Sequence, residues 1–162
     1  MIVHHLKQTQ ILPLTMEQAW EFFSTPRNLD QITPDDLGFK ITYLPSEQMY
    51  AGQIITYKVM ICPGVWVPWV TEISHVDEGV SFVDQQLSGP YKLWHHRHTF
   101  EPHPEGVLMT DLVHYSIGFS LLGEIPHRLF VRRKLERIFQ FRQQVLAELF
   151  PLSHPASAAI EG

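Results

Sequence analysis

Several residues with acid–base or metal-binding side chains occur in two successive segments that have the composition of β-strands. His96 and His98 lie in the segment 92–100, and Asp111 lies in the segment 107–117. Side chains alternate between the two faces of a strand, so His96 and His98 share one face. A hairpin of the two segments would bring both imidazoles to the carboxylate. Histidine changes charge near neutral pH, and an adjacent carboxylate orients it as a general acid or base.

The pairing of these segments decides which side chains meet. We expect the face that carries the large aromatic residues Trp94 and Phe100 to point into the protein. A shift of one residue would turn this whole set outward. The hairpin that keeps the apolar faces together gives the pairs Phe100–Met109, His98–Asp111, His96–Val113 and Trp94–Tyr115.

Two further charged residues are expected at the same interior surface. In the preceding segment, 80–87, alternation places Asp84 on the same face as Phe82. Arg142 projects into the middle of the apolar stripe of the last helix. Buried charges need partners, so we expect Arg142 to meet Asp84, Asp111 or the anionic group of a ligand.

A metal is the alternative use of the same side chains. His96, His98 and Asp111 supply two imidazoles and one carboxylate, which is the ligand set of non-haem iron sites. Histidines two apart on a strand are common without a metal, so the sequence predicts no metal and no cofactor. Nucleophilic catalysis has no support, because the chain contains no G-x-S-x-G and Cys62 has no evident histidine partner. We expect Cys62 to be a small buried side chain in a strand.

A long C-terminal helix should form the wall opposite these strands. No Gly or Pro interrupts the chain from His127 to Phe150, and Pro151 then ends the pattern, which predicts a helix from Pro126 to Phe150. Spacing of about 3.6 residues per turn collects its apolar residues into one stripe. This stripe contains Val131, Leu135, Ile138, Phe139, Val145, Leu146 and Leu149.

The rest of the chain predicts one strand, two short helices and then six strands. Residues 2–12 read as the first strand, and Thr15 with Gln18 has the form of a capping box that starts a helix ending at Ser24. A second short helix follows Pro26. The six further segments are rich in β-branched and aromatic residues, and their short connections favour antiparallel pairing. They span 39–44, 53–62, 66–75, 80–87, 92–100 and 107–117.

Several phrases of the sequence resemble the SRPBCC superfamily, which has the helix-grip fold of START lipid-transfer domains and birch-pollen-allergen-like proteins. The resemblance is to its bacterial polyketide cyclase/dehydrase-type branch and covers nearly all of 2–150. It implies an α+β fold in which a curved antiparallel sheet of about seven strands wraps around the long C-terminal helix. The phrases are WEFFSTPRNL at 20–29, FVDQQ at 82–86, GPY at 89–91, WHHRHTF at 94–100 and RKLERIFQFR at 133–142.

One domain over residues 1–150 follows, with 151–162 as a flexible tail rich in Ser, Ala and Pro. The first functional hypothesis is binding of a small hydrophobic molecule, lipid-like or aromatic and polyketide-like, between sheet and helix. The second is a cyclase, aromatase or dehydratase in which His98 and Asp111 act as acid and base. The third is a protein-interaction module. The predicted ligand contacts are Asp84, Trp94, His96, His98, Phe100, Asp111, Tyr115, Ile138 and Arg142.

Composition limits the partners and the location. A hydrophobic content of 44% and a charged content of 18% are typical of a globular chain, and a formal net charge of −5 argues against a nucleic-acid partner. No apolar run is long enough to span a membrane, and no signal peptide is visible, so we expect a cytoplasmic protein without integral membrane contact. The expected state is a monomer or a homodimer. Six of the twelve basic residues lie in the last helix, as a solvated face or as a patch for an anionic lipid or acidic partner.

Overall fold

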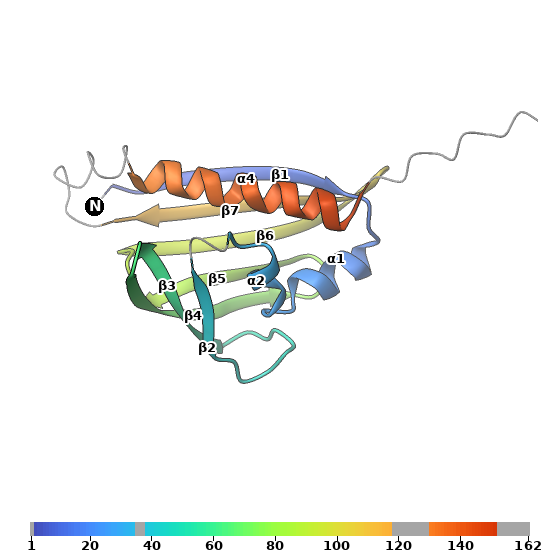
Figure 1. Ribbon diagram of the computed structural model, residues 1–162. Coiled ribbons are helices and arrows are strands. Elements are labelled where there is room, and N and C mark those ends of the chain that lie inside the picture. Colours follow the sequence, from blue (N-terminus) through green and yellow to red (C-terminus); the bar gives the residue numbers. More distant parts are fainter. Residues whose placement is uncertain (1, 35–37, 118–129, 152–162) are drawn as a thin grey trace, which may run out of the picture.

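Seven antiparallel strands form one curved sheet, and the C-terminal helix lies along it (Figure 1). The computed structural model describes residues 2–34, 38–117 and 130–151. The strands are β1 (His4–Leu12), β2 (Phe39–Tyr43), β3 (Gln53–Cys62), β4 (Val65–Asp77), β5 (Ser81–Ser88), β6 (Leu93–His103) and β7 (Gly106–Ser116). The helices are α1 (Met16–Phe23), α2 (Asn28–Gln31) and α4 (Arg132–Leu149). The order across the sheet is β1-β7-β6-β5-β4-β3-β2, which confirms the predicted helix-grip architecture.

The two short helices close one end of the curved sheet. The capping box at Thr15 is present, since its hydroxyl accepts from the backbone of Gln18 and the Gln18 side chain accepts from the backbone of Thr15. Helix α1 buries Ala19 and Phe23, which pack in one core cluster with residues of β5, β6 and β7. The rings of Trp20 and Phe23 also contact Phe100 of β6, so aromatic side chains fill the space between α1 and the sheet.

Helix α4 packs against β1 and carries four buried side chains: Leu135, Phe139, Arg142 and Leu146. Gln8 of β1 donates to the carbonyl of Phe139, which fixes the helix along the first strand. The predicted first turn, from Pro126 to Leu129, lies outside the described residues, as does the tail after Pro151. Leu149, predicted in the apolar stripe, is exposed in the last turn of the helix.

The predicted pairing of the two histidine-bearing strands is confirmed. Residues of β6 and β7 pair as Trp94–Tyr115, His96–Val113, His98–Asp111 and Phe100–Met109. His96, His98 and Phe100 are all buried, so this face of β6 points inward as expected. One expectation about a neighbouring strand is wrong: Cys62 is exposed, because the register shifts after Met60 and β3 ends there at its turn into β4.

The core falls into three clusters. One packs α1 and the end of α4 against β5, β6 and β7, and another packs the first half of α4 against β7. The third lies on β3 and β4, around Ile55, Tyr57 and Ile73. No helix among the described residues is long and apolar enough to span a membrane.

Candidate functional site

A pocket of about 440 Å³ lies between the sheet and helix α4. Residues of α1, α2, β2 to β6 and α4 line it, including Ile55, Ile73, Phe82 and Leu135. Pockets that hold small molecules measure roughly 300–1,000 Å³ and are lined mainly by apolar and aromatic side chains. The pocket therefore has the size and the wall of a small-molecule site.

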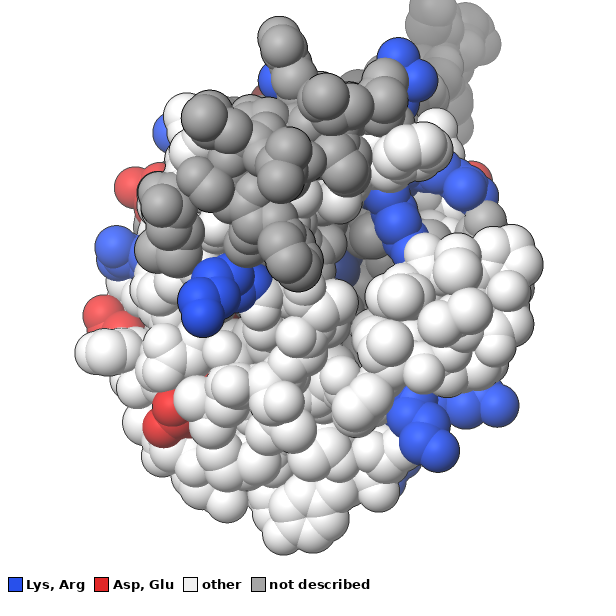
Figure 2. Space-filling model, turned by 90° about the vertical axis from the view of Figure 1, so that its left-hand side faces the viewer, with Lys and Arg blue, Asp and Glu red and all other residues white. Residues whose placement is uncertain are grey.

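The pocket reaches the surface where helix α4 begins. Ile61 and Phe130 line it there and are exposed by 42% and 70%. Lys134 of α4 donates to the carbonyls of Met60 and Ile61, so it joins the helix to the end of β3 beside this opening. On this end of the molecule the Lys and Arg side chains form several small groups separated by uncharged residues, and Asp and Glu side chains lie on the same face (Figure 2). The described residues show no single basic patch on this face.

Three adjacent strands bring two carboxylates to the two inward histidines. Asp84 of β5 lies opposite His96 of β6, and His98 of β6 lies opposite Asp111 of β7. The remaining two combinations are diagonal neighbours, which are still within reach of ring side chains. Each imidazole therefore meets both carboxylates.

The four contacts form a closed ring of alternating imidazoles and carboxylates. Nε2 of His96 lies 3.0 Å from Oδ1 of Asp111, and Nε2 of His98 lies 3.2 Å from Oδ2 of Asp84; both are hydrogen bonds. Nδ1 of His96 lies 3.2 Å from Oδ2 of Asp84. Nδ1 of His98 lies 2.8 Å from Oδ1 of Asp111 and has no hydrogen-bonding geometry to any described residue.

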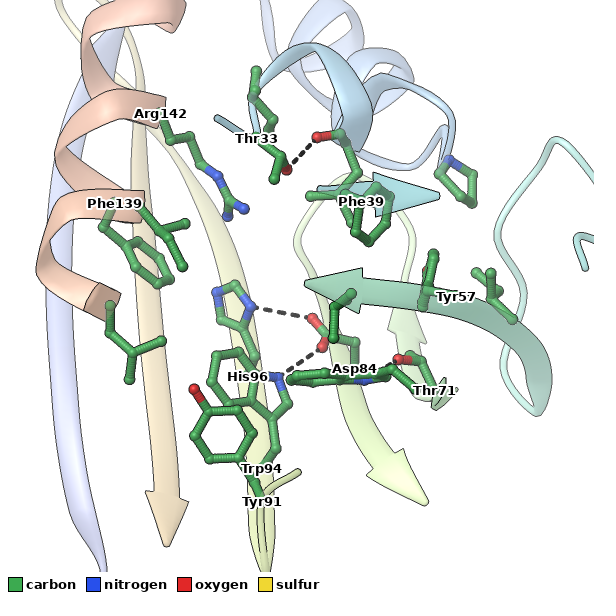
Figure 3. A pocket seen from close by; sticks show the side chains of 18 of the residues that line it. Thr33, Phe39, Tyr57, Thr71, Asp84, Tyr91, Trp94, His96, Phe139 and Arg142 are labelled. Carbon is green, nitrogen blue, oxygen red and sulfur yellow. Dashed lines mark hydrogen bonds and ion pairs between the residues drawn. The ribbon is translucent and has the colours of Figure 1, made fainter. Parts of the chain in front are cut away.

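Several aromatic side chains pack against the ring of imidazoles and carboxylates on its pocket side (Figure 3). The indole nitrogen of Trp94 donates to Oδ1 of Asp84 over 3.2 Å. Tyr91 and Trp69 stack at angles against Trp94, with ring centres 4.9 and 5.3 Å away. Phe82 stacks on His98 with ring centres 4.1 Å apart. These contacts surround the side chains of Asp84 and His98 with aromatic rings.

The charges of the ring stabilise one another against the cost of burial. Burial alone would raise the pKa of Asp84 and Asp111, but the adjacent imidazoles attract their charged forms and hold both pKa values below the usual range. Burial alone would lower the pKa of His96, but the charge of Asp84 and the hydrogen bonds to both carboxylates raise it to about 9. His96 is therefore a buried cation near neutral pH in the absence of any other cation.

Arg142 is the exception to this pairing. It is 8% exposed, lines the pocket, and points from α4 into it (Figure 3). The ion pairs of Asp84 and Asp111 are with the imidazoles, and Nε of Arg142 has no hydrogen-bond partner among the described residues. Its guanidinium lies 5.0 Å from the ring centre of Phe139. Burial lowers the pKa of Arg142, and the attraction of the two carboxylates offsets only part of this effect.

Not all of the predicted ligand contacts line the pocket. Phe100 is in the core, edge-on to Trp20 of α1, because the short helices cover that end of β6. Asp111 lies behind the imidazoles, since it stands on β7, one strand further from the pocket. Tyr115 is buried among the rings of His4 and Tyr91. The predicted residues that do line the pocket are Asp84, Trp94, His96, His98, Ile138 and Arg142.

Sequence reasoning missed two features of the site. Trp69 and Tyr91 line the pocket and hold Trp94, but they come from β4 and from the loop before β6. The sequence shows that both segments contain aromatic residues, but it does not show that these residues pack against each other. Three residues also meet the geometry of a metal site: ligand atoms of Asp84, His96 and His98 lie within 4.8 Å of one another.

Comparisons with known proteins reveal similarity of structure only. No family model matches the sequence, and no curated protein matches it. Among solved structures, the Zhui aromatase/cyclase from Streptomyces sp. R1128 superposes with a TM-score of 0.70 at 13% identity, over 91% of this chain and 93% of that one. The ginseng major latex-like protein 151 from Panax ginseng gives 0.63 at 15% identity, over 92% and 98%. Protein CV1439 from Chromobacterium violaceum gives 0.66 at 13% identity, over 91% and 97%. At these identities the similarity establishes the helix-grip fold alone.

Proposed function

We propose that the protein binds a small, largely apolar molecule that carries one anionic or carbonyl oxygen group, in the pocket between the sheet and α4. One observation supports this most strongly. A pocket of about 440 Å³ with apolar walls contains the buried guanidinium of Arg142, whose Nε has no hydrogen-bond partner among the described residues.

The apolar walls of the pocket indicate that most of the ligand is apolar. Ile55, Ile73 and Leu135 come from the sheet and from α4 and are almost fully buried, yet all three line the pocket. Covering an apolar surface with an apolar ligand contributes about 25 cal/mol for each Å² removed from water. A lipid-like or aromatic molecule gains most from such walls.

The polar end of the ligand follows from Arg142. A buried charge without a hydrogen-bonded partner costs several kcal/mol, and a carboxylate or enolate oxygen would offset this cost. A guanidinium binds a carboxylate through two parallel hydrogen bonds. The ligand is therefore expected to direct its oxygen group toward α4 and its apolar body toward β3 and β4.

Native mass spectrometry of freshly purified protein tests the proposal first. A bound mass of a few hundred daltons that is lost on denaturation supports it, and solvent extraction identifies the class of molecule. The second measurement compares binding of an aromatic or aliphatic carboxylic acid with binding of its methyl ester. Saturable binding that favours the acid is expected. Absence of saturable binding of either compound at millimolar concentration would refute the proposal.

An enzyme of cyclase, aromatase or dehydratase type is the second candidate. The observation that favours it is the position of His98, which lines the pocket with Nδ1 2.8 Å from Asp111. One protein of the same fold is an aromatase/cyclase. The assay is turnover of the extracted ligand or a related carbonyl compound, followed by His98→Gln. Unchanged turnover in His98→Gln would exclude acid–base catalysis by this residue. No observation favours the third hypothesis, a protein-interaction module: the described residues on the face in Figure 2 form no continuous charged surface.

A further inference from the structure

The ring of imidazoles and carboxylates has the geometry of a metal centre on its pocket side. We propose that Asp84, His96 and His98 bind a divalent first-row transition-metal ion, with zinc and ferrous iron as the chemically matched ions. This set differs from the one that the sequence suggested, because Asp84 takes the place of Asp111. Metal binding is measured in the absence of the pocket ligand.

The distances between the donor atoms fit one ion. Oδ2 of Asp84 lies 3.2 Å from Nδ1 of His96 and 3.2 Å from Nε2 of His98. Two ligands that are each about 2.1 Å from a tetrahedral or octahedral ion are themselves about 3.0 to 3.4 Å apart. Both separations from the carboxylate oxygen therefore match those that an ion would impose, and ligand atoms of all three residues lie within 4.8 Å of one another.

The atoms that would not touch the ion have the partners that metal ligands normally have. An ion on Nδ1 of His96 and Nε2 of His98 leaves the other nitrogen of each ring protonated. These two nitrogens lie 3.0 and 2.8 Å from the same oxygen, Oδ1 of Asp111. The free oxygen of Asp84 accepts from Trp94. The contact of His96 is a hydrogen bond, whereas Nδ1 of His98 is close to Asp111 without hydrogen-bonding geometry. A carboxylate behind a ligating histidine orients the ring and increases its basicity.

The number of N–H groups that the two imidazoles can supply also favours a cation between Asp84, His96 and His98. The ring contains four nitrogen–oxygen contacts of 2.8 to 3.2 Å. Two imidazoles supply four N–H groups only when both are doubly protonated, and otherwise a nitrogen lone pair faces a carboxylate oxygen. An ion between Asp84 and the two rings removes this conflict with both imidazoles neutral.

The open coordination positions of the ion would face the pocket. Asp84, His96 and His98 line the pocket, whereas Asp111 does not. Two imidazoles and one carboxylate on one side, with the other side open, is an arrangement found in zinc and non-haem iron enzymes. A ligand oxygen that enters the pocket would meet the ion and Arg142 together.

Cobalt titration of the metal-free protein tests the site. The protein is purified without a metal-affinity column, treated with a chelator, and titrated with Co²⁺ while the visible d–d absorption is recorded. His4 and His5 are adjacent near the N-terminus, so a His4→Gln/His5→Gln background removes an adventitious site. We expect saturation at one equivalent, and X-ray absorption at the metal edge should show two imidazoles.

Variants assign the ion to its ligands. Asp84→Asn and His98→Gln should weaken Co²⁺ binding at least a hundredfold, and Asp111→Asn ten- to a hundredfold. The control is His95→Gln, which lies on the opposite face of the same strand, beside His114, and should bind Co²⁺ like the parent. Circular dichroism checks that each variant folds.

Two results would overturn the proposal. One is the absence of saturable binding by the folded parent protein. The other is binding that folded Asp84→Asn and His98→Gln variants retain. If either variant fails to fold, the edge spectrum of the parent decides, and fewer than two imidazoles on the ion refutes the assignment.

Discussion

Replacing Arg142 by methionine should make the protein more stable and a poorer binder of acids. The guanidinium is 8% exposed, and Nε has no hydrogen-bond partner among the described residues. Its pKa is lowered, so burial disfavours the charged form by more than Asp84 and Asp111 favour it. Methionine has a similar length and no charge, so it keeps the packing and removes the desolvation cost.

The expected change in the free energy of unfolding of Arg142→Met is the sum of two opposing contributions. Replacing buried charged groups by apolar residues of similar volume is neutral or stabilises proteins by about 1–4 kcal/mol. Loss of the cation–π contact with Phe139 costs up to about 2 kcal/mol in a desolvated site. Taking the middle of the stabilising range and of the cation–π range, we expect a net gain of about 1–2 kcal/mol in the free energy of unfolding. For a chain of this size that corresponds to a rise in Tm of roughly 3–6 °C.

The assay is urea denaturation of Arg142→Met and of a matched control, Arg133→Met. Arg133 lies on the exposed side of the same helix, where substitutions change the free energy of unfolding by less than about 0.5 kcal/mol. Both variants are then tested for binding of the carboxylic acid and its methyl ester. Arg142→Met should lose at least about tenfold in affinity for the acid and little for the ester.

A loss of about 1 kcal/mol or more in Arg142→Met would refute this reasoning. It would mean that the guanidinium stabilises the two carboxylates by more than its own burial costs. Equal affinity of Arg142→Met and the parent for the acid would refute the proposed position of the ligand's oxygen group, even if the variant were more stable.

Three further substitutions test the packing and the pocket. Phe100→Ala should cost about 3–5 kcal/mol in urea unfolding, because the ring is 1% exposed against α1; a cost below about 1 kcal/mol would contradict that core. Gly106→Ala should cost more than about 2 kcal/mol, since φ is +136° and a Cβ would collide with a backbone carbonyl of β1. Gly79→Ala is the control, because a Cβ at Gly79 would meet open space, and it should lower the free energy of unfolding by about 1 kcal/mol. Equal losses in Gly106→Ala and Gly79→Ala would contradict the clash at Gly106. Ile138→Trp narrows the pocket and should weaken ligand binding at least tenfold, whereas Gln140→Trp on the exposed side of α4 should not; equal affinities would show that the ligand binds elsewhere.

Local patterns in the sequence were enough to predict the elements and one pairing. Alternation along β6 and β7 placed His98 opposite Asp111, because a side-chain period of two residues leaves one register that buries both apolar faces. The capping box at Thr15 and the apolar stripe around Leu135 and Phe139 depend on residues within one or two turns of a helix. Such signals are contained in short segments and do not require the rest of the fold.

The composition of the site depends on contacts between distant segments. Whether Asp84 reaches both imidazoles is decided by the diagonal offsets between three strands. Asp111 was predicted in the pocket, but its strand lies one position further along the sheet. Arg142 faces the pocket, with Nε unbonded to any described residue, because of where α4 docks relative to those strands. The sequence by itself therefore determined which charged residues are interior. Only the tertiary structure decided which of them satisfy one another and which face the pocket, because these contacts join segments that are far apart in the chain.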